Sequence, residues 1–187
     1  MKYKKFSIVA SIIAALIVVM VVIFGCLKVN NGLEINNPDS ILVYSKSVVA
    51  NEYTLEETPS VYNKLKSLYK EMTNLTVFDF MLSKNDIHTK PTQDINNKYK
   101  EWTNVNKQSG YCVVFLYNEK QSIIISIDCD TKVIEFYGLI MQVSENVGVQ
   151  KIALYFSTTS GSSKTYSDSP IVVIGKQKAM FNYVKEL

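Results

Sequence analysis

The side chains that could perform acid–base or nucleophilic chemistry are few in this sequence. The chain has one histidine, His88, and its acidic candidates are Asp79, Asp128 and Asp130. A serine hydrolase needs a histidine base beside its nucleophile, and the G-x-S-x-G turn that often carries such a serine is absent. A pocket that gathered two of these residues would indicate a hydrolase. On separate turns they would be ordinary solvated side chains.

Carboxylates also cluster where a cation could bind. Asp128 and Asp130, with Glu135 nearby, could offer oxygens to a hard cation such as Ca²⁺. An Asp-x-Asp pair is equally typical of a tight turn, where aspartate bonds its own backbone, and this interpretation is favoured. The paired cysteines or histidines of a zinc site are missing, as are Gly-rich phosphate-binding motifs. The sequence therefore predicts no metal and no cofactor.

Two cysteines lie in the most apolar part of the chain after the N-terminus. The segments 111–117 and 122–128 flank a polar stretch, 118–121, and so predict a β-hairpin. In the register set by that turn, Cys112 and Cys129 are diagonal neighbours on one face. A shift of one residue would place them opposite each other, within reach of a disulfide. Otherwise they are two small buried side chains. Both interpretations stay open.

The N-terminal segment Phe6–Leu27 is the longest apolar run and carries no charged residue. It follows a cationic start made by Lys2, Lys4 and Lys5. About 20 apolar residues in a helix cross a hydrocarbon core of about 30 Å, and flanking lysines favour the cytoplasmic side. We therefore expect a bilayer anchor with a cytoplasmic N-terminus, and a chain that lies outside the cytoplasm from residue 28 onward.

Cys26 offers a second kind of anchor. Ile23, Gly25 and Cys26 fit the pattern of a bacterial lipoprotein cleavage site, at which the cysteine receives lipid, whereas Phe24 is bulkier than that pattern usually has. The apolar run is also longer than the 7–15 residues typical of a signal peptide. A retained single-pass helix is favoured over a lipoprotein, and cleavage with release is the third alternative.

Charge excludes a nucleic-acid partner. All 20 basic residues are Lys, and the three that precede Phe6 account for the whole net charge of +3. The rest of the chain is neutral, and without arginine it has no bidentate group for phosphate. We divide the chain into an anchor or signal segment at 1–27, a linker at 28–40 and an extracytoplasmic domain at 41–187. The linker is rich in Asn.

The domain is expected to be α+β: an antiparallel β-meander packed against helices, because turns of about four residues join successive strands. A helix should begin at Pro59, capped by Thr58, and end at Thr73. We expect core positions at Phe115, Phe136, Tyr155 and Phe156, and along the first helix at Val61, Leu65, Leu68 and Met72. The expected strands are 41–44, 47–53, 75–82, 111–117, 122–128, 132–143, 150–156 and 171–174, and the last helix is 176–187 with Ala179, Met180, Tyr183, Val184 and Leu187 inward.

The order of elements resembles small membrane-anchored, lipoprotein-like proteins of low-GC Gram-positive bacteria. The features that carry the resemblance are the Lys-rich anchor, Ile41 to Tyr44, the helix from Val61 to Thr73 and the tail from Ser169 to Leu187. It implies a place at the cell membrane and no mechanism. We expect a non-enzymatic binding or accessory module of the cell envelope. The alternative is an envelope hydrolase that uses the dispersed Asp and His residues.

Overall fold

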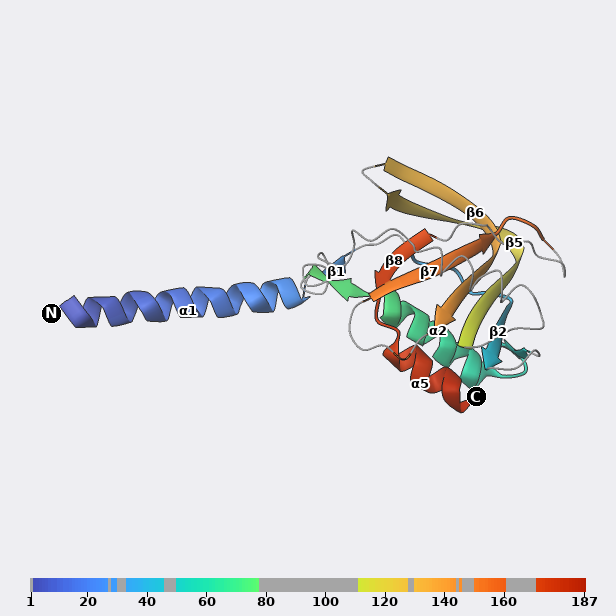
Figure 1. Ribbon diagram of the computed structural model, residues 1–187, viewed down its shortest axis with the longest axis horizontal. Coiled ribbons are helices and arrows are strands. Elements are labelled where there is room, and N and C mark those ends of the chain that lie inside the picture. The colour runs from blue at the N-terminus through green and yellow to red at the C-terminus, as the bar shows by residue number, and fades with distance from the viewer. Residues whose placement is uncertain are drawn as a thin grey trace.

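The structure, a computed structural model, describes residues 2–26, 28–29, 33–45, 50–77, 111–127, 130–143, 145, 150–160 and 171–187. Within these ranges it is an α+β protein with an antiparallel sheet, as the sequence predicted. Figure 1 shows the sheet with two helices against one face and a third helix that extends away from this body.

The sheet has the strand order β3-β2-β5-β6-β7-β8, and every neighbouring pair is antiparallel. β5 to β8 are a meander in sequence order, which confirms that part of the prediction, while the β2–β3 hairpin adds to the free side of β5. A separate short pair joins β1 to β4. The strands are β1 (Lys28–Val29), β2 (Ser40–Ser45), β3 (Asn51–Thr54), β4 (Leu75–Thr76), β5 (Tyr111–Ile127), β6 (Asp130–Val143), β7 (Gln150–Ser157) and β8 (Ile171–Gly175).

The hairpin predicted around residues 118–121 is wrong. β5 continues through this polar stretch as one strand, and its register with β6 shifts between Leu116 and Gln121. Leu116 pairs with Gly138 and Gln121 with Phe136, so four residues of β5 stand against one residue of β6. The polar residues form a bulge instead of a turn, because a strand as long as β6 lies alongside to pair with both apolar halves.

The predicted first helix is confirmed as α2 (Pro59–Thr73). Pro59 suits the first helical position, where its missing N–H leaves no hydrogen bond unmade. Thr58 precedes the helix but its hydroxyl does not cap it. That hydroxyl instead donates to the carbonyl of Thr54 and accepts from the Thr54 N–H, at 3.1 and 3.0 Å, so it closes the turn after β3.

The last helix, α5 (Lys178–Glu186), is shorter than the predicted 176–187. Met180 and Val184 are buried as expected, and Tyr183 and Leu187 are partly buried. Ala179 is exposed, and Phe181 takes a buried place that the prediction did not give it. Its ring meets Tyr111 edge-on at 5.3 Å, so the large aromatic side chain decides which face of α5 turns inward.

The main core lies between the sheet and the pair α2 and α5, which lie side by side (Figure 1). Of the four aromatic residues predicted to be in the core, Phe115, Phe136 and Phe156 pack there and Tyr155 is buried on the opposite face of the sheet. Along α2, Leu65, Leu68 and Met72 are buried as predicted, and Val61 is partly buried. Tyr62 and Tyr69 are buried beside them at 1% and 2% exposure.

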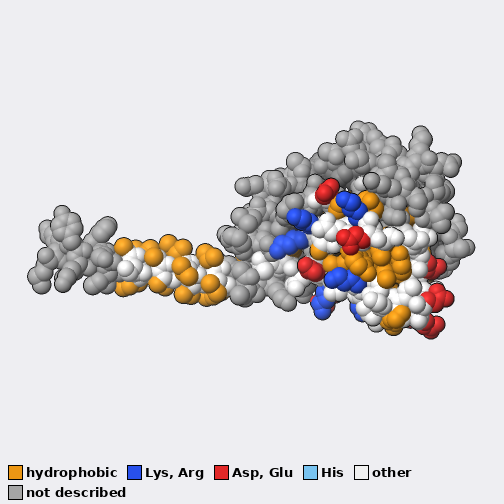
Figure 2. Space-filling view, turned by 90° about the horizontal axis from the view of Figure 1, so that it is seen from below, with side chains coloured by type: hydrophobic (Ala, Val, Ile, Leu, Met, Phe, Trp, Pro, Cys, Tyr) orange, Lys and Arg blue, Asp and Glu red, His pale blue; other side chains and the backbone are white. Residues whose placement is uncertain are grey.

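The helix α1 (Lys2–Cys26) contains the N-terminal apolar segment. Every side chain from Ala10 to Ile23 is exposed. Figure 2 shows this stretch as a rod of mostly apolar side chains with no charged group in view. No helix within the described part of the chain qualifies, by length and apolarity together, as a membrane span.

Candidate functional site

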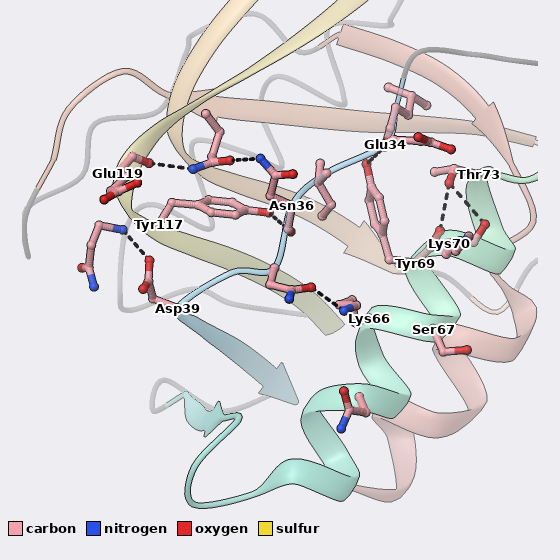
Figure 3. A pocket seen from close by; sticks show the side chains of 16 residues that line it. Glu34, Asn36, Asp39, Lys66, Ser67, Tyr69, Lys70, Thr73, Tyr117 and Glu119 are labelled. Carbon is pink, nitrogen blue, oxygen red and sulfur yellow. Dashed lines mark hydrogen bonds between the residues drawn. The ribbon is translucent and has the colours of Figure 1, made fainter.

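A cavity of about 1000 Å³, which we call the groove, opens beside α2 (Figure 3). Three parts of the chain border it: the extended stretch Leu33–Asp39, which we call the strap, one side of α2, and β5 at its bulge. The lining residues are Leu33, Glu34, Ile35, Asn36, Asn37, Asp39, Asn63, Lys66, Ser67, Tyr69, Lys70, Thr73, Tyr117, Asn118, Glu119 and Gln121. Cavities of this size are typical of small-molecule and short-ligand sites.

The first wall is a polar stripe on α2. Asn63, Lys66, Ser67, Lys70 and Thr73 line the groove, and their spacings of three and four place them on one side of the helix. This stripe is displaced around the helix from the buried one, so the same 15 residues supply both a core face and a binding face.

Three tyrosine hydroxyls hold the second wall, the strap, in place. Tyr62 donates to the carbonyl of Pro38 at 2.6 Å, and Tyr69 donates to that of Leu33 at 3.0 Å. From β5, Tyr117 donates to the carbonyl of Asn36 at 3.3 Å. Buried backbone carbonyls need donors, and these side chains give the strap bonds of the kind that a neighbouring strand would supply.

Burial keeps these donors protonated. Desolvation raises the pKa of Tyr69 well above its usual value. It does the same to Tyr117, where the neighbouring Tyr69, Tyr62 and Asp39 raise the pKa further. Their rings are fixed by aromatic contacts: Tyr69 meets Phe115 edge-on at 5.1 Å, and Tyr117 meets Phe136 edge-on at 5.6 Å. Each of these two hydroxyls is thus uncharged, and the packing of its ring against a core phenylalanine fixes its position.

The groove begins where β2 stops pairing with β5. The Asp39 N–H donates to the carbonyl of Leu116 at 2.8 Å, and the Asp39 carboxylate accepts from the Asn118 N–H at 2.6 Å. The Asp39 carboxylate thus accepts the hydrogen bond that the backbone carbonyl of a further β2 residue would otherwise accept, and the β2–β5 pairing ends here. Beyond it, the strap turns away from β5, and the bulge carries Asn118 and Glu119 to the rim of the space between them.

Polar side chains connect the walls. The Asn36 amide donates to the Gln121 side-chain oxygen at 2.7 Å, and the Gln121 amide donates to the carbonyl of Glu119 at 3.1 Å. On the other side, the Lys66 ammonium donates to the side-chain oxygen of Asn37. The strap is therefore tied by its side chains to β5 and to α2 as well as by its backbone.

The charges around the groove are separated. Lys66 and Lys70 stand on α2, whereas Asp39 and Glu119 lie at the opposite end of the view in Figure 3, where β2 meets the bulge. A third carboxylate, Glu34, lies toward the Lys70 end. One end is thus net acidic and the other net basic. Such a site can bind a polar ligand by hydrogen bonds and charge.

The acid and base candidates of the hydrolase alternative fall almost entirely on residues that the structure does not describe. Asp79, His88 and Asp128 lie outside the described residues. Asp130 opens β6 opposite Ile127. Glu135 is exposed and pairs with Lys120 at 3.1 Å. Within the described residues, no group of three or more His, Cys, Asp and Glu side chains is arranged to hold a metal ion.

Cys112 is a free thiol, buried on the sheet face away from α2. It pairs with Tyr44 on one side and with Gln142 on the other. Cys129 itself lies outside the described residues. Burial raises the pKa of the Cys112 thiol to about 12. Cys26, the lipidation candidate, is the last residue of α1.

The groove residues were missed by sequence reasoning, although two signals were present. Tyr62 and Tyr69 are seven residues apart on one helix, two turns along the same face. The stretch 28–40 is predicted to be a linker because it is rich in Asn, yet Leu33 within it is 1% exposed and packs in the main core. Two apolar residues, Leu33 and Ile35, stand among the polar ones and are the sign that this part of the stretch packs on the domain.

Comparison with models of protein families, with curated proteins and with solved structures gives no match. The function is accordingly derived from the geometry of the groove and of α1.

Proposed function

We propose that this protein is a membrane-anchored binding module of the cell envelope, that the groove is its ligand site and that it performs no chemistry on the ligand. The observation that carries the proposal is the position of the strap. The strap is the stretch of chain between α1 and the sheet, and it forms one wall of the groove. The anchor and the ligand site are thus built from adjoining residues.

The anchoring role is supported by the uncharged run from Phe6 to Leu27, which is longer than the stretch whose side chains are described. A helix that is apolar all around needs an apolar environment. The large apolar side chains between Ile12 and Ile23 are exposed to about half or more of their area, for example Ile12 at 56% and Val18 at 61%, so the described part of the chain does not provide one. A lipid bilayer does, with the retained helix preferred over a lipid on Cys26.

The binding role is supported by the character of the groove. It is large, it is lined by amides, hydroxyls and both signs of charge, and its carboxylates are spread over separate elements. The neutral balance of charge beyond residue 27 removes any reason to expect a nucleic acid there. Within the described residues, no observation supports the alternative hypothesis of an envelope hydrolase.

Thiol labelling of intact cells tests the topology. In a full-length background with the three native cysteines replaced by alanine, Glu57→Cys places a thiol on the exposed turn before α2. A membrane-impermeant maleimide should label it without permeabilisation. The matched variant Lys4→Cys should be labelled only after permeabilisation. Labelling of Lys4→Cys alone in intact cells would refute the proposed location.

A further inference from the structure

We infer that the groove binds a short extended peptide that carries opposite charges at its two ends. This ligand class depends on the proposed binding role of the groove. It follows from three features of the lining: the separation of its charges, its length along α2 and the chemistry of its uncharged side chains.

The separated charges match a dipolar ligand. Lys66 and Lys70 lie one helical turn apart on α2 and outnumber Glu34 at this end, so the net charge there favours a ligand carboxylate. At the other end, Glu119 is exposed and Asp39 has one carboxylate oxygen engaged by the Asn118 N–H. These oxygens favour an ammonium group. A ligand of one sign only would meet repulsion at one end of the groove.

The length of the groove suits a few residues of extended chain. The lining on α2 runs from Asn63 to Thr73, which at 1.5 Å per residue is about 15 Å of helix axis. An extended chain advances about 3.3–3.6 Å per residue, so about four residues cover this length. Both lysines lie within this length, whereas Asp39 and Glu119 lie across the groove from α2, so the length indicates the size of the ligand and not the spacing of its charges.

The uncharged part of the lining suits a peptide backbone. Asn63 and Ser67 line the groove from α2, and Asn118 and Gln121 line it from β5, beside Glu119. Amides and hydroxyls both donate and accept hydrogen bonds, as a peptide unit does in turn through its N–H and its carbonyl. The chain has no arginine, so a phosphate would not find the bidentate partner that recognises it best. A groove of this kind would recognise the backbone and the charged termini of the peptide more than its side chains.

Titration calorimetry on the full-length protein in detergent micelles tests the inference. The probes are tetra-alanine with free termini, the same peptide acetylated and amidated, the two singly blocked forms, and the neutral glycan chitotetraose. Each block should weaken binding about threefold, which is about 0.65 kcal/mol for one partly exposed charge pair, and both together about tenfold.

Variants locate the two ends. Lys70→Gln should weaken the binding of the peptide with free termini about threefold, and it should not change the affinity for the C-terminally amidated peptide. Glu119→Gln should likewise weaken the binding of the peptide with free termini about threefold, and it should not change the affinity for the N-terminally acetylated peptide. Both side chains are exposed, so the fold should survive, and Lys178→Gln on the exposed face of α5 is the matched control.

Each other outcome has a definite meaning. Equal affinity for free and blocked tetra-alanine would overturn the dipolar ligand and leave the groove as a binding site. Binding of chitotetraose in preference to the peptides would replace the peptide by a glycan. Absence of peptide binding up to about 10 mM would overturn the inference, since a specific groove should reach a millimolar Kd. The proposed location is decided separately, by the thiol labelling.

Discussion

The hydroxyl of Tyr69 on α2 donates a hydrogen bond to the backbone carbonyl of Leu33, at 3.0 Å. Both residues are buried, Tyr69 at 2% and Leu33 at 1% exposure. This bond fixes the start of the strap against the helix that forms the opposite wall of the groove. The shape of the groove therefore depends on side-chain hydroxyls, and single oxygen atoms can be removed to test it.

Tyr69→Phe should destabilise the protein by about 1–3 kcal/mol, because it leaves the buried Leu33 carbonyl without its donor. The ring and its contact with Phe115 remain, so the core should stay packed. Urea unfolding of the full-length protein in micelles measures the change. Tyr53→Phe is the control, since the Tyr53 hydroxyl makes no hydrogen bond within the described residues. Equal changes in the two variants would contradict the role given to Tyr69.

Gly175→Ala should destabilise the protein by about 1–3 kcal/mol through overpacking. A Cβ at this position would lie 2.5 Å from the Ile152 side chain and 2.9 Å from the backbone carbonyl of Met72. The side chain can move aside, but the carbonyl belongs to α2 and also accepts from the Lys176 N–H at 3.1 Å. Thermal unfolding checks this, with Asn182→Ala on the exposed face of α5 as control. A Tm unchanged from wild type would refute the close packing.

The free energy of unfolding should fall above pH 9 partly because of Cys112. Burial raises the pKa of its thiol from 9.0 to about 12, so the folded protein keeps a proton that the unfolded chain releases. The stabilisation is complete below pH 9 and is lost as the pH rises toward about 12, at up to about 1.4 kcal/mol per pH unit.

The variant Cys112→Ala lacks this titration. Its deficit in unfolding free energy relative to wild type should therefore shrink between pH 9 and about 12. Buried tyrosines contribute to alkaline unfolding in both proteins, since burial also raises the pKa of Tyr155 to about 12. Denaturant unfolding at a series of pH values gives the difference. A deficit that stays constant would mean that the thiol is ionised in the folded protein.

Metabolic labelling with radioactive palmitate should give no incorporation into the wild-type protein or into Cys26→Ala. We expect this result because a retained helix holds the protein without lipid. Incorporation that disappears in Cys26→Ala would show a lipoprotein instead. In that case the anchor changes, while the groove and its ligand are unaffected.

The sequence predicted the elements whose local pattern and tertiary environment agree. The apolar spacing of Leu65, Leu68 and Met72 defined α2, and Pro59 marked its start. β7 and β8 are strands whose apolar residues meet the core on a strand period: Ile152, Leu154 and Phe156, then Ile171 and Val173. In each of these, the residues that favour the element are also the residues that the fold buries.

The bulge in β5 could not be predicted from local residues. Asn118 and Gln121 belong to a polar stretch with good turn chemistry, and a turn there would make a hairpin of two short strands. What decides against it is β6, which begins at Asp130 and is long enough to pair on both sides of the stretch. Only long-range pairing distinguishes a bulge from a turn, and here the bulge supplies a wall of the groove.

The groove was beyond prediction for a related reason. Among the strands that the structure describes, none pairs with the strap along Leu33–Pro38, and the strap is held by tyrosines that are 24 to 81 residues away in sequence. A tyrosine on an amphipathic helix is most simply interpreted as core, and Tyr62 and Tyr69 are indeed core residues. Their hydroxyls have a second task that only the folded arrangement reveals.

The short distance between α1 and the strap sets how far the site can reach. Seven residue steps lead from Cys26 to Leu33, and an extended chain covers at most about 25 Å over that number. In the proposed membrane location of α1, this length keeps the groove within a thin layer next to the lipid headgroups. A ligand displayed on the same membrane would be confined with the groove at a local concentration of about millimolar. A weakly binding peptide would therefore occupy the groove at the membrane and dissociate from it in open solution.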